Sequence, residues 1–448
     1  MSSAKCSIQI APGQGIHISS ALRKTLGIGK PGQISLIFGS RTITSDLVLT
    51  RKSGHSLRLS PALAAELKLP HAGNCLVTKR GSSEIQIGPL IGILAARTEH
   101  EGISFGGMSG FFRQIISAGE GQSYSFAFSP KDVNWEEETV TGYFPLKTGG
   151  WIRRSLPLPD VVYNRMQSRQ TERDQSMSSF KDRFLRRSIP LFNWSFFNKS
   201  DVYKLLVDDP LAHHIPESHL NPTVNTMKEM LNKYGTVYLK PSGGSLGVGI
   251  YKLIRQRAKL YTVRYRSRGQ NKAVNYTSAD RMINTLLKHQ QSRFHQYIAQ
   301  QGIDLIQIES CPVDFRFHMT KDGENKWVVA AVGAKKAGKG SITTHVASGG
   351  KVLATDQVFR QVFGGNAAQM LRKVRSTAVD LARAIERHYP YLLGEIGFDL
   401  GIDRSGNVWM FEANAKPGRS IFKHPTAKIG ERASLSNLIG FCKYLSKF

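Results

Sequence analysis

An internal repeat near the N-terminus restricts the fold of this chain more than any other feature. Residues 16–40 and 57–81 look like two copies of one unit, because IHISSALRKTLGIGKPGQISLI and LRLSPALAAELKLPHAGNCLVT align without a gap at an offset of 41 residues (57 − 16). The matched pairs are Ile16 and Leu57, Ile18 and Leu59, Ser19 and Ser60, Ala21 and Ala62, Leu22 and Leu63, Leu26 and Leu67, and Gly32 and Gly73. Each copy predicts a strand, a serine-capped short helix, a glycine turn and a second strand. A lone fragment of this size cannot bury its apolar face, so the two copies should close on each other as a small pseudo-twofold β-barrel.

The chain is expected to form three domains. Residues 1–88 hold the repeat, whose pattern is similar to double-psi or swapped-hairpin barrels; such barrels serve as substrate, partner or DNA platforms, and the sequence does not choose among them. Gly88-Pro89 then interrupts the chain, and residues 89–198 begin with strand, helix and strand in the order of an α/β layer. Residues 199–448 form the third expected domain.

A glycine-rich loop lies early in the third domain, in KYGTVYLKPSGGSLGVGIYKLI. The pattern predicts a strand that ends at Lys240, a loop and a second strand. The loop contains Ser242, Gly243, Gly244, Ser245, Gly247 and Gly249. Glycines let backbone N–H groups approach phosphate oxygens, and a lysine beside them adds positive charge. No Lys-Ser/Thr pair follows and no helix opens, so this is not a P-loop. An ordinary glycine-rich hairpin is the alternative.

Residues 394–418, GEIGFDLGIDRSGNVWMFEANAKPG, predict two strands joined by a turn. Such a hairpin would bring Asp399 alongside Glu412 and Asn414, and the last two share a face because they are two residues apart. Two carboxylates and an amide oxygen form an oxygen-only site that suits Mg²⁺. A surface hairpin with solvated acids is the alternative, but the apolar residues 409–411 indicate a covered strand, where unpaired carboxylates are costly.

Two further segments carry candidate residues. An apolar strand ends in Gln300 and Gln301, whose amides suit the edge of an adenine. In CPVDFRFHMTK, Asp314 and Arg316 alternate and therefore face the same side of a strand. An arginine in that position can neutralise a transferring phosphate, although a cross-strand ion pair is an equally ordinary use of these residues.

Together these signals resemble an ATP-grasp domain. Lys199, Lys240 with its glycine loop, Gln300-Gln301, Asp314-x-Arg316 and Asp399…Glu412-x-Asn414 occur in the order of that fold, and the resemblance covers roughly residues 89–448. The segments PLPDVVYNR, IPLFNWSFFNK, YLKPSGGSLGVGI, PVDFRF and KGSITTHVASGGKV look more narrowly like the endospore coat-associated ATP-grasp proteins of the YheC/YheD type. The resemblance implies an α/β (α+β) protein, an ATP-grasp fold preceded by an α/β layer and the small N-terminal barrel.

The resemblance also implies roles for these residues. Lys199 and Lys240 would contact adenine-side and phosphate groups, Gln300 and Gln301 the hinge around adenine, Arg316 the terminal phosphate, and Asp399, Glu412 and Asn414 the Mg²⁺ ion; Asp314 is grouped with the nucleotide-binding residues. Many ATP-grasp peptide ligases have an asparagine where this chain has His345, and some have an arginine where it has Lys335. Lys335 and Arg316 are the expected catalytic residues. Both departures lie on the substrate side.

The expected function is an ATP- and Mg²⁺-dependent carboxylate-amine ligase that acts through an acyl phosphate and is associated with the endospore coat. The carboxylate and amine substrates are unidentified, and spore coat proteins are candidate partners. One alternative is a non-catalytic spore coat protein that retains ATP binding. Another is a basic protein that binds polyanions or nucleic acid.

The charge balance bears on these alternatives. The chain has 61 Lys and Arg against 33 Asp and Glu, a net charge of +28, which favours polyanions such as nucleotides, nucleic acid, cell-wall polymer or acidic peptides. A solvated surface would also explain it, although basic residues concentrate between 255 and 272. No zinc-finger spacing, basic zipper or RNP motif is present, so a dedicated nucleic-acid reader is not expected.

Cysteine usage and hydropathy bear on location. The four cysteines lie far apart without a CxxC pair, which indicates reduced thiols rather than zinc ligands or disulfides. No apolar run has the length of a transmembrane segment. The cytoplasm of the mother cell is the expected location, with the spore coat as the second.

Overall fold

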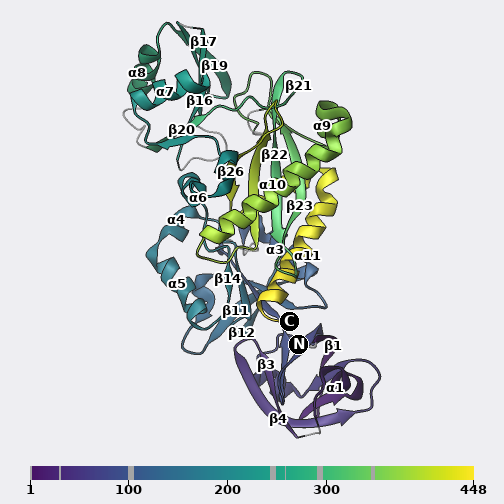
Figure 1. The fold of residues 1–448 in the computed structure, drawn as a ribbon. Coiled ribbons are helices and arrows are strands. Elements are labelled where there is room, and N and C mark those ends of the chain that lie inside the picture. The colour runs from purple at the N-terminus through teal and green to yellow at the C-terminus, as the bar shows by residue number, and fades with distance from the viewer. Residues whose placement is uncertain are drawn as a thin grey trace.

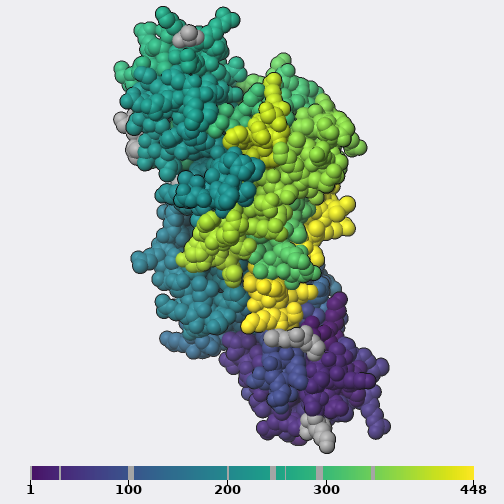
Figure 2. Space-filling model, viewed as in Figure 1, coloured from purple at the N-terminus to yellow at the C-terminus, as the bar shows by residue number. Residues whose placement is uncertain are grey.

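The computed structural model describes residues 3–29, 32–98, 105–242, 249–257, 259–289, 296–344 and 349–448. Strands in these ranges form a barrel and three open sheets, arranged along an elongated molecule with the barrel at one end (Figure 1). The space-filling view shows residues of the 200–290 region, in teal, beside the green and yellow C-terminal part at the end opposite the barrel (Figure 2). Within the described ranges, no helix is long and apolar enough to cross a membrane.

The N-terminal barrel is closed, as the repeat predicts, with strand order β1-β5-β2-β4-β3-β7-β6. Its elements are β1 (Ser3–Ile10), β2 (Ile16–Ser19), α1 (Ser20–Leu26), β3 (Gln33–Phe38), β4 (Arg41–Thr50), β5 (Ser56–Leu59), α2 (Pro61–Glu66), β6 (Gly73–Gly81) and β7 (Glu84–Gly88). Each copy of the repeat is therefore a strand, a helix and a strand.

Both serine caps of the repeat are present. The Ser19 hydroxyl accepts a hydrogen bond from the backbone N–H of Leu22, and the Ser60 hydroxyl accepts one from Leu63, each at 3.2 Å. Strands β2 and β5 pair antiparallel, with His17 directly opposite Arg58. These two residues are equivalent under the 41-residue offset. A pairing of equivalent residues from the two copies is what a pseudo-twofold axis passing between β2 and β5 would produce.

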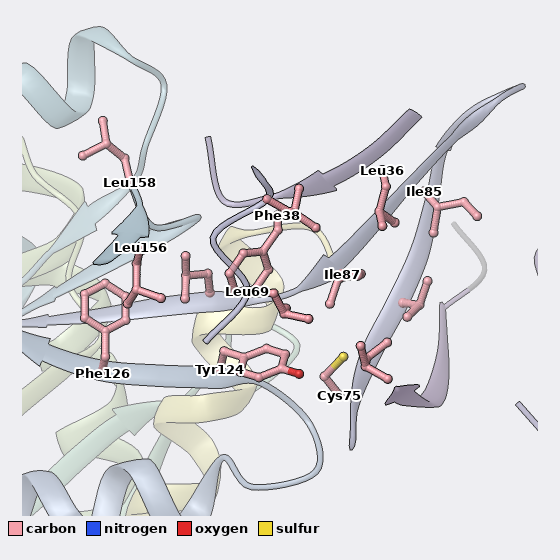
Figure 3. Packing of buried hydrophobic residues seen from close by; sticks show 14 of the residues in the cluster. Leu36, Phe38, Leu69, Cys75, Ile85, Ile87, Tyr124, Phe126, Leu156 and Leu158 are labelled. Atoms are coloured by element: carbon pink, nitrogen blue, oxygen red, sulfur yellow. The ribbon is translucent and has the colours of Figure 1, made fainter. Parts of the chain in front are cut away.

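The barrel packs tightly on the next sheet. Figure 3 shows Phe38 of the barrel beside Tyr124 of the neighbouring sheet, and the two rings meet edge to face with centroids 5.3 Å apart. At Gly39, where φ is +55°, an added Cβ would lie 2.3 Å from the Leu158 carbonyl oxygen. The barrel and this sheet therefore share one apolar core.

The second sheet has the order β10-β11-β9-β8-β13-β14, with β12 paired to β11, and its strands β9, β8, β13 and β14 run parallel. The elements are β8 (Leu90–Leu94), α3 (Ser109–Ala118), β9 (Tyr124–Phe128), β10 (Val133–Asn134), β11 (Thr139–Pro145), β12 (Trp151–Pro157), β13 (Val161–Asn164), α4 (Arg169–Arg173), α5 (Gln175–Arg186) and β14 (Leu191–Phe192). This is the α/β layer predicted after Pro89.

The third sheet, called here the nucleotide-side sheet, has the order β15-β20-β16-β17-β18-β19 and is antiparallel. Its elements, with the helix α6 that precedes it, are α6 (Lys199–Leu206), β15 (Ser218–Leu220), α7 (Val224–Tyr234), β16 (Thr236–Pro241), β17 (Tyr251–Arg257), β18 (Leu260–Ser267), β19 (Gln270–Tyr276), α8 (Ala279–His289) and β20 (Tyr297–Gln301). Helices α7 and α8 pack on one face and bury its apolar residues.

The fourth sheet, called here the C-terminal sheet, has the order β24-β23-β22-β25-β26, and β21 pairs with β22. Its elements are β21 (Gln307–Ile308), β22 (Cys311–Lys321), β23 (Trp327–Lys336), β24 (Lys351–Leu353), α9 (Thr355–Phe363), α10 (Ala367–His388), β25 (Glu395–Ile402), β26 (Val408–Asn414) and α11 (Lys428–Leu445). Helices α6, α9 and α10 share an apolar core with one face of this sheet. On the other face, α11 packs against β22 and β23, and the polar residues of the candidate site lie beside it.

Candidate functional site

The predicted hairpin is formed by β25 and β26, with Asp399 directly opposite Glu412 and Gly397 opposite Asn414. Asp403 fixes the turn, because its carboxylate accepts hydrogen bonds from the backbone N–H groups of Ser405 and Asn407 at 2.9 and 2.8 Å. A fixed turn sets the register. The expected juxtaposition of Asp399 and Glu412 is therefore confirmed.

Alternation along β22 and β25 separates an apolar face from a polar one. Phe315 and Phe317 of β22 lie in the core under α9 and α10, as does Phe398 of β25. Arg316 points to the other face and lies opposite Asp399 in the register. A Cβ at Gly397 would lie 3.1 Å from Arg316 Nη2, so the absence of a side chain there lets the guanidinium lie across β25.

Four charged side chains form one network on this polar face. Arg316 Nη1 donates to Asp399 Oδ2 at 2.9 Å, and Lys335 Nζ lies 2.8 Å from Asp399 Oδ1 and 3.0 Å from Asp314 Oδ1. Burial would raise the pKa of Asp399, but Arg316 and Lys335 outweigh it and hold the pKa at about 2. Burial raises the pKa of Asp314, which Lys335 only partly offsets. The cross-strand ion pair given as the alternative for Arg316 is thus present, with Asp399 of β25 as its partner.

Glu412 and Asn414 differ from Asp399 in having free oxygen atoms. Neither side chain forms a hydrogen bond or ion pair with any residue that the structure describes. Nor do the described residues contain a cluster of three or more His, Cys, Asp or Glu that could hold a metal. The donor set therefore fits a hard cation only if the Asn414 amide and non-protein oxygens complete the shell, which is how Mg²⁺ is usually held beside phosphates.

Lys240 and Gln300 lie together on adjacent strands of the nucleotide-side sheet. Lys240 Nζ donates to Gln300 Oε1 at 2.5 Å, and Gln300 Nε2 donates to Ser218 Oγ at 3.1 Å and to the Tyr203 hydroxyl. The Tyr203 hydroxyl donates to the Phe411 carbonyl oxygen at 3.2 Å. One chain of hydrogen bonds therefore links Lys240 to β26, next to Glu412.

The other expected nucleotide residues are distributed less evenly. Gln301 is used structurally, since its Oε1 accepts from the Glu217 backbone N–H at 3.1 Å. Ser242 N–H donates to the Gln296 carbonyl at 2.7 Å, and Gly249 has φ +73°. Lys199 is the first residue of α6. Gly243, Gly244, Ser245, Gly247 and His345 lie outside the described residues.

A buried charged cluster beside the hairpin was not predicted. Glu395, at the start of β25, accepts from the Tyr163 hydroxyl at 2.6 Å and from Arg165 Nη1 at 3.0 Å, and lies 2.8 Å from His318 Nε2. Burial alone would raise the pKa of Glu395, but Arg165 and the other donors hold it at about 2. The cluster joins β13 of the second sheet to the C-terminal sheet. Alternation in β22 places His318 on the same face as Arg316, but nothing in the sequence names its distant partners.

A small polar hollow of about 130 Å³ lies near this cluster, against the start of α6. It is lined by Arg169, Glu172, Arg173, Ser195, Phe196, Asn198 and Asp201. Among these lining residues, Arg169 has a pKa that burial lowers and that the charge of Glu412 partly restores.

Comparison with known proteins decides the family. The model for YheC/D-like ATP-grasp proteins matches residues 188–445. This chain belongs to that family. It is 35% identical over 421 residues to the endospore coat-associated protein YheD of Bacillus subtilis (strain 168), covering 93% of this chain and 91% of YheD. It is 23% identical over 301 residues to YheC of the same organism, covering 65% of this chain and 80% of YheC.

Among solved structures, the VanG D-Ala:D-Ser ligase from Enterococcus faecalis matches with 14% identity and a TM-score of 0.46, covering 80% of this chain and 99% of the ligase. The family match agrees with the resemblance stated from the motifs. The matched residues include Lys240, Arg316 and the β25–β26 hairpin, and they do not include the N-terminal barrel.

Proposed function

We propose that the protein is an ATP- and Mg²⁺-dependent carboxylate-amine ligase that acts through an acyl phosphate. The observation that carries the proposal is the polar face of the C-terminal sheet, where Asp399, Glu412 and Arg316 lie in one row across three strands. The hydrogen-bond chain from Lys240 to Phe411 joins that row to the nucleotide-side sheet. Membership of the ATP-grasp family supports ATP as the nucleotide.

Each residue has a distinct part in the proposal. Lys240 and Arg316 offset the charge of the phosphates, and Lys335 holds Asp314 and Asp399 in place from the neighbouring strand β23. Glu412, Asn414 and Asp399 would hold Mg²⁺, which supplies charge neutralisation at the transferring phosphoryl group. A substrate carboxylate attacks the γ-phosphorus and ADP leaves; an amine then attacks the acyl carbon and phosphate leaves.

The ion pairs of Asp399 limit how many of its oxygen atoms could coordinate a metal. Both of its oxygens already meet a cation, Arg316 on one side and Lys335 on the other. Glu412 is the carboxylate without such a partner among the described residues. Glu412 is therefore the principal metal ligand in this proposal, and Asp399 contributes by orienting Arg316 toward the phosphates.

The direct test has two stages. Thermal melts of the purified protein with and without Mg·ATP measure nucleotide binding, because a ligand that binds only the folded state raises the midpoint. Release of ADP is then measured with pools of carboxylates and amines. A midpoint shift together with ADP release that needs both a carboxylate and an amine supports a ligase.

A non-catalytic coat protein that keeps its nucleotide site is the second candidate, and the name of the relative YheD favours it. In that case Mg·ATP raises the melting midpoint while every acceptor pool leaves ADP at background. For either function we place the protein in the mother cell or its spore coat, with coat proteins as candidate partners.

A further inference from the structure

Strands β16 to β19 form an unusually basic part of the chain. Residues 236–276 contain no Asp or Glu, and their nine basic residues are Lys240, Lys252, Arg255, Arg257, Lys259, Arg264, Arg266, Arg268 and Lys272. None of the eight from Lys252 onward has an ion pair within the described part of the chain. On the helices that cover the other face of this sheet, by contrast, Lys228 of α7 is paired with Asp280 of α8 at 2.9 Å. From Lys252 onward these strands thus carry cations that no carboxylate of the described residues neutralises.

The strand register places part of this charge on one face, in line with the candidate site. Tyr238 lies between Gln300 on β20 and Lys252 on β17, and Lys252 in turn lies opposite Arg264 on β18. Lys252 Nζ is 5.4 Å from the centroid of the Tyr238 ring, so the two share that face. Three strand spacings separate Gln300 from Arg264, about 14 Å. Arg266, two residues on, has the same orientation; we call Lys252, Arg264 and Arg266 the basic face.

On β17 to β19, the face opposite the basic face holds the aromatic residues. Tyr251, Tyr261, Tyr265 and Tyr276 lie in or against the apolar core that α7 and α8 complete. The side chains that accompany the basic face on β18 and β19 are Thr262, Asn271, Ala273 and Asn275. Proteins that bind single-stranded nucleic acid combine basic residues with aromatic side chains on which the bases stack. The basic face has one aromatic neighbour, Tyr238 of β16 beside Lys252, and none on β17 to β19. It therefore lacks the series of aromatic side chains on which successive bases would stack, which favours a carboxylate-bearing polymer.

The basic face is turned toward the C-terminal sheet. Asn271 on β19 lies beside the loop that follows β23: a Cβ at Gly340 would be 3.9 Å from Asn271 Nδ2. The neighbouring Lys339 in that loop is exposed. The basic face therefore begins next to Lys240 and Gln300 and runs across β17 and β18 to β19, where Asn271 approaches the loop of the C-terminal sheet.

We propose that the basic face binds an acidic polypeptide in an extended conformation. Arg264 and Arg266 are about 7 Å apart along β18, which equals the spacing of alternate side chains in an extended peptide, so successive acidic residues on one side can meet both. Arg264 is exposed and Arg266 half-buried, and neither has a partner to give up among the described residues. An acidic peptide could therefore pair with both arginines without any rearrangement of the sheet.

The test uses the full-length protein and fluorescein-labelled poly-L-glutamate of about 20 residues, which in extended form exceeds the length of the face. Fluorescence anisotropy measures binding without nucleotide. The variant Arg264→Ala/Arg266→Ala removes two charges from the face. The control Arg372→Ala/Arg375→Ala removes two from exposed positions on α10. The first should weaken binding about tenfold and the control less than about twofold.

Three results would overturn the proposal. Equal loss in both variants would show that the net charge of +28, and not this face, attracts the peptide. If the unaltered protein did not bind poly-L-glutamate, the basic face would not be a binding site for acidic polypeptides. Tighter binding of a single-stranded DNA of matched length, lost in Arg264→Ala/Arg266→Ala, would assign the face to nucleic acid. Because the assay contains no ATP, each outcome leaves the ligase proposal standing.

Discussion

Asp399 and Glu412 lie opposite each other on β25 and β26, but they differ in their contacts, and a matched pair of substitutions tests the different roles that we propose for them. Asp399→Asn and Glu412→Gln each remove one negative charge at nearly constant shape. Asp399 accepts from Arg316 and Lys335, whereas Glu412 has no such partner among the described residues. We expect Asp399→Asn to destabilise the fold and Glu412→Gln to leave it intact.

The magnitude follows from the pKa of Asp399, which falls from its ordinary value of 3.8 to about 2. That drop corresponds to about 2 kcal/mol of folding free energy. The side chain is 19% exposed, so solvent screens the pairs only weakly. Because the folded-state pKa is the lower one, this stability is fully present above pH 3.8 and is lost as the pH falls toward 2. Asp399→Asn should therefore cost about 2 kcal/mol at pH 7 and much less near pH 2.

Urea denaturation followed by tryptophan fluorescence measures the change, since Trp327 and Trp409 lie in the C-terminal sheet. Glu412→Gln should unfold within about 0.5 kcal/mol of the unaltered protein, the range for substitutions that break no buried contact. It should nevertheless abolish Mg²⁺-dependent ADP release. If Asp399→Asn matched the unaltered protein at pH 7, or if Glu412→Gln were the less stable variant, the division of duties would be wrong.

Three further predictions rest on single contacts. Lys240→Ala should weaken ATP binding at least about tenfold in a nucleotide titration, because it removes a charge-assisted contact; an unchanged affinity would remove Lys240 from the site. Ser19→Ala and Ser60→Ala should each lower the unfolding free energy of the barrel by about 1 kcal/mol in urea melts, and no loss in either would argue against the caps. Cys6 and Cys75 are buried, and burial raises the pKa of the Cys6 thiol to about 12. Neither should react with a thiol reagent at pH 8 until the protein is unfolded; rapid labelling of the native protein would contradict their burial.

The parts of the structure that the sequence predicts are those set by local periodicity. The serine caps and the equivalence of His17 and Arg58 follow from the 41-residue repeat, and the register of Asp399 with Glu412 follows from a short hairpin. Each depends on neighbours within a few tens of residues, where strand alternation and turn length leave little freedom. The domain limits at residues 88 and 198 stay predictions.

Contacts between distant segments escaped prediction. Glu395 meets Arg165 and Tyr163, which lie about 230 residues earlier, and Lys335 bridges Asp314 and Asp399 from a third strand. The alternation of side chains along a strand predicts which face of the sheet each one occupies, but it does not predict which strand lies next to it. The order β23-β22-β25-β26 places these charges together, and that order comes from the packing of whole sheets.

The two sides of the candidate site carry opposite charge, and this follows from how the pairs are distributed. On the C-terminal sheet, Arg316 and Lys335 formally balance Asp314 and Asp399, whereas Glu412 has no ion pair among the residues that the structure describes. On the nucleotide-side sheet, the charged side chains of the face that holds Lys240, Lys252, Arg264 and Arg266 are all cations. A divalent cation is therefore favoured at the first sheet and phosphate or carboxylate groups at the second, and a metal-bound nucleotide satisfies both. An acidic polypeptide on the basic face would likewise place anionic groups against the cations of the nucleotide-side sheet, farther from the nucleotide.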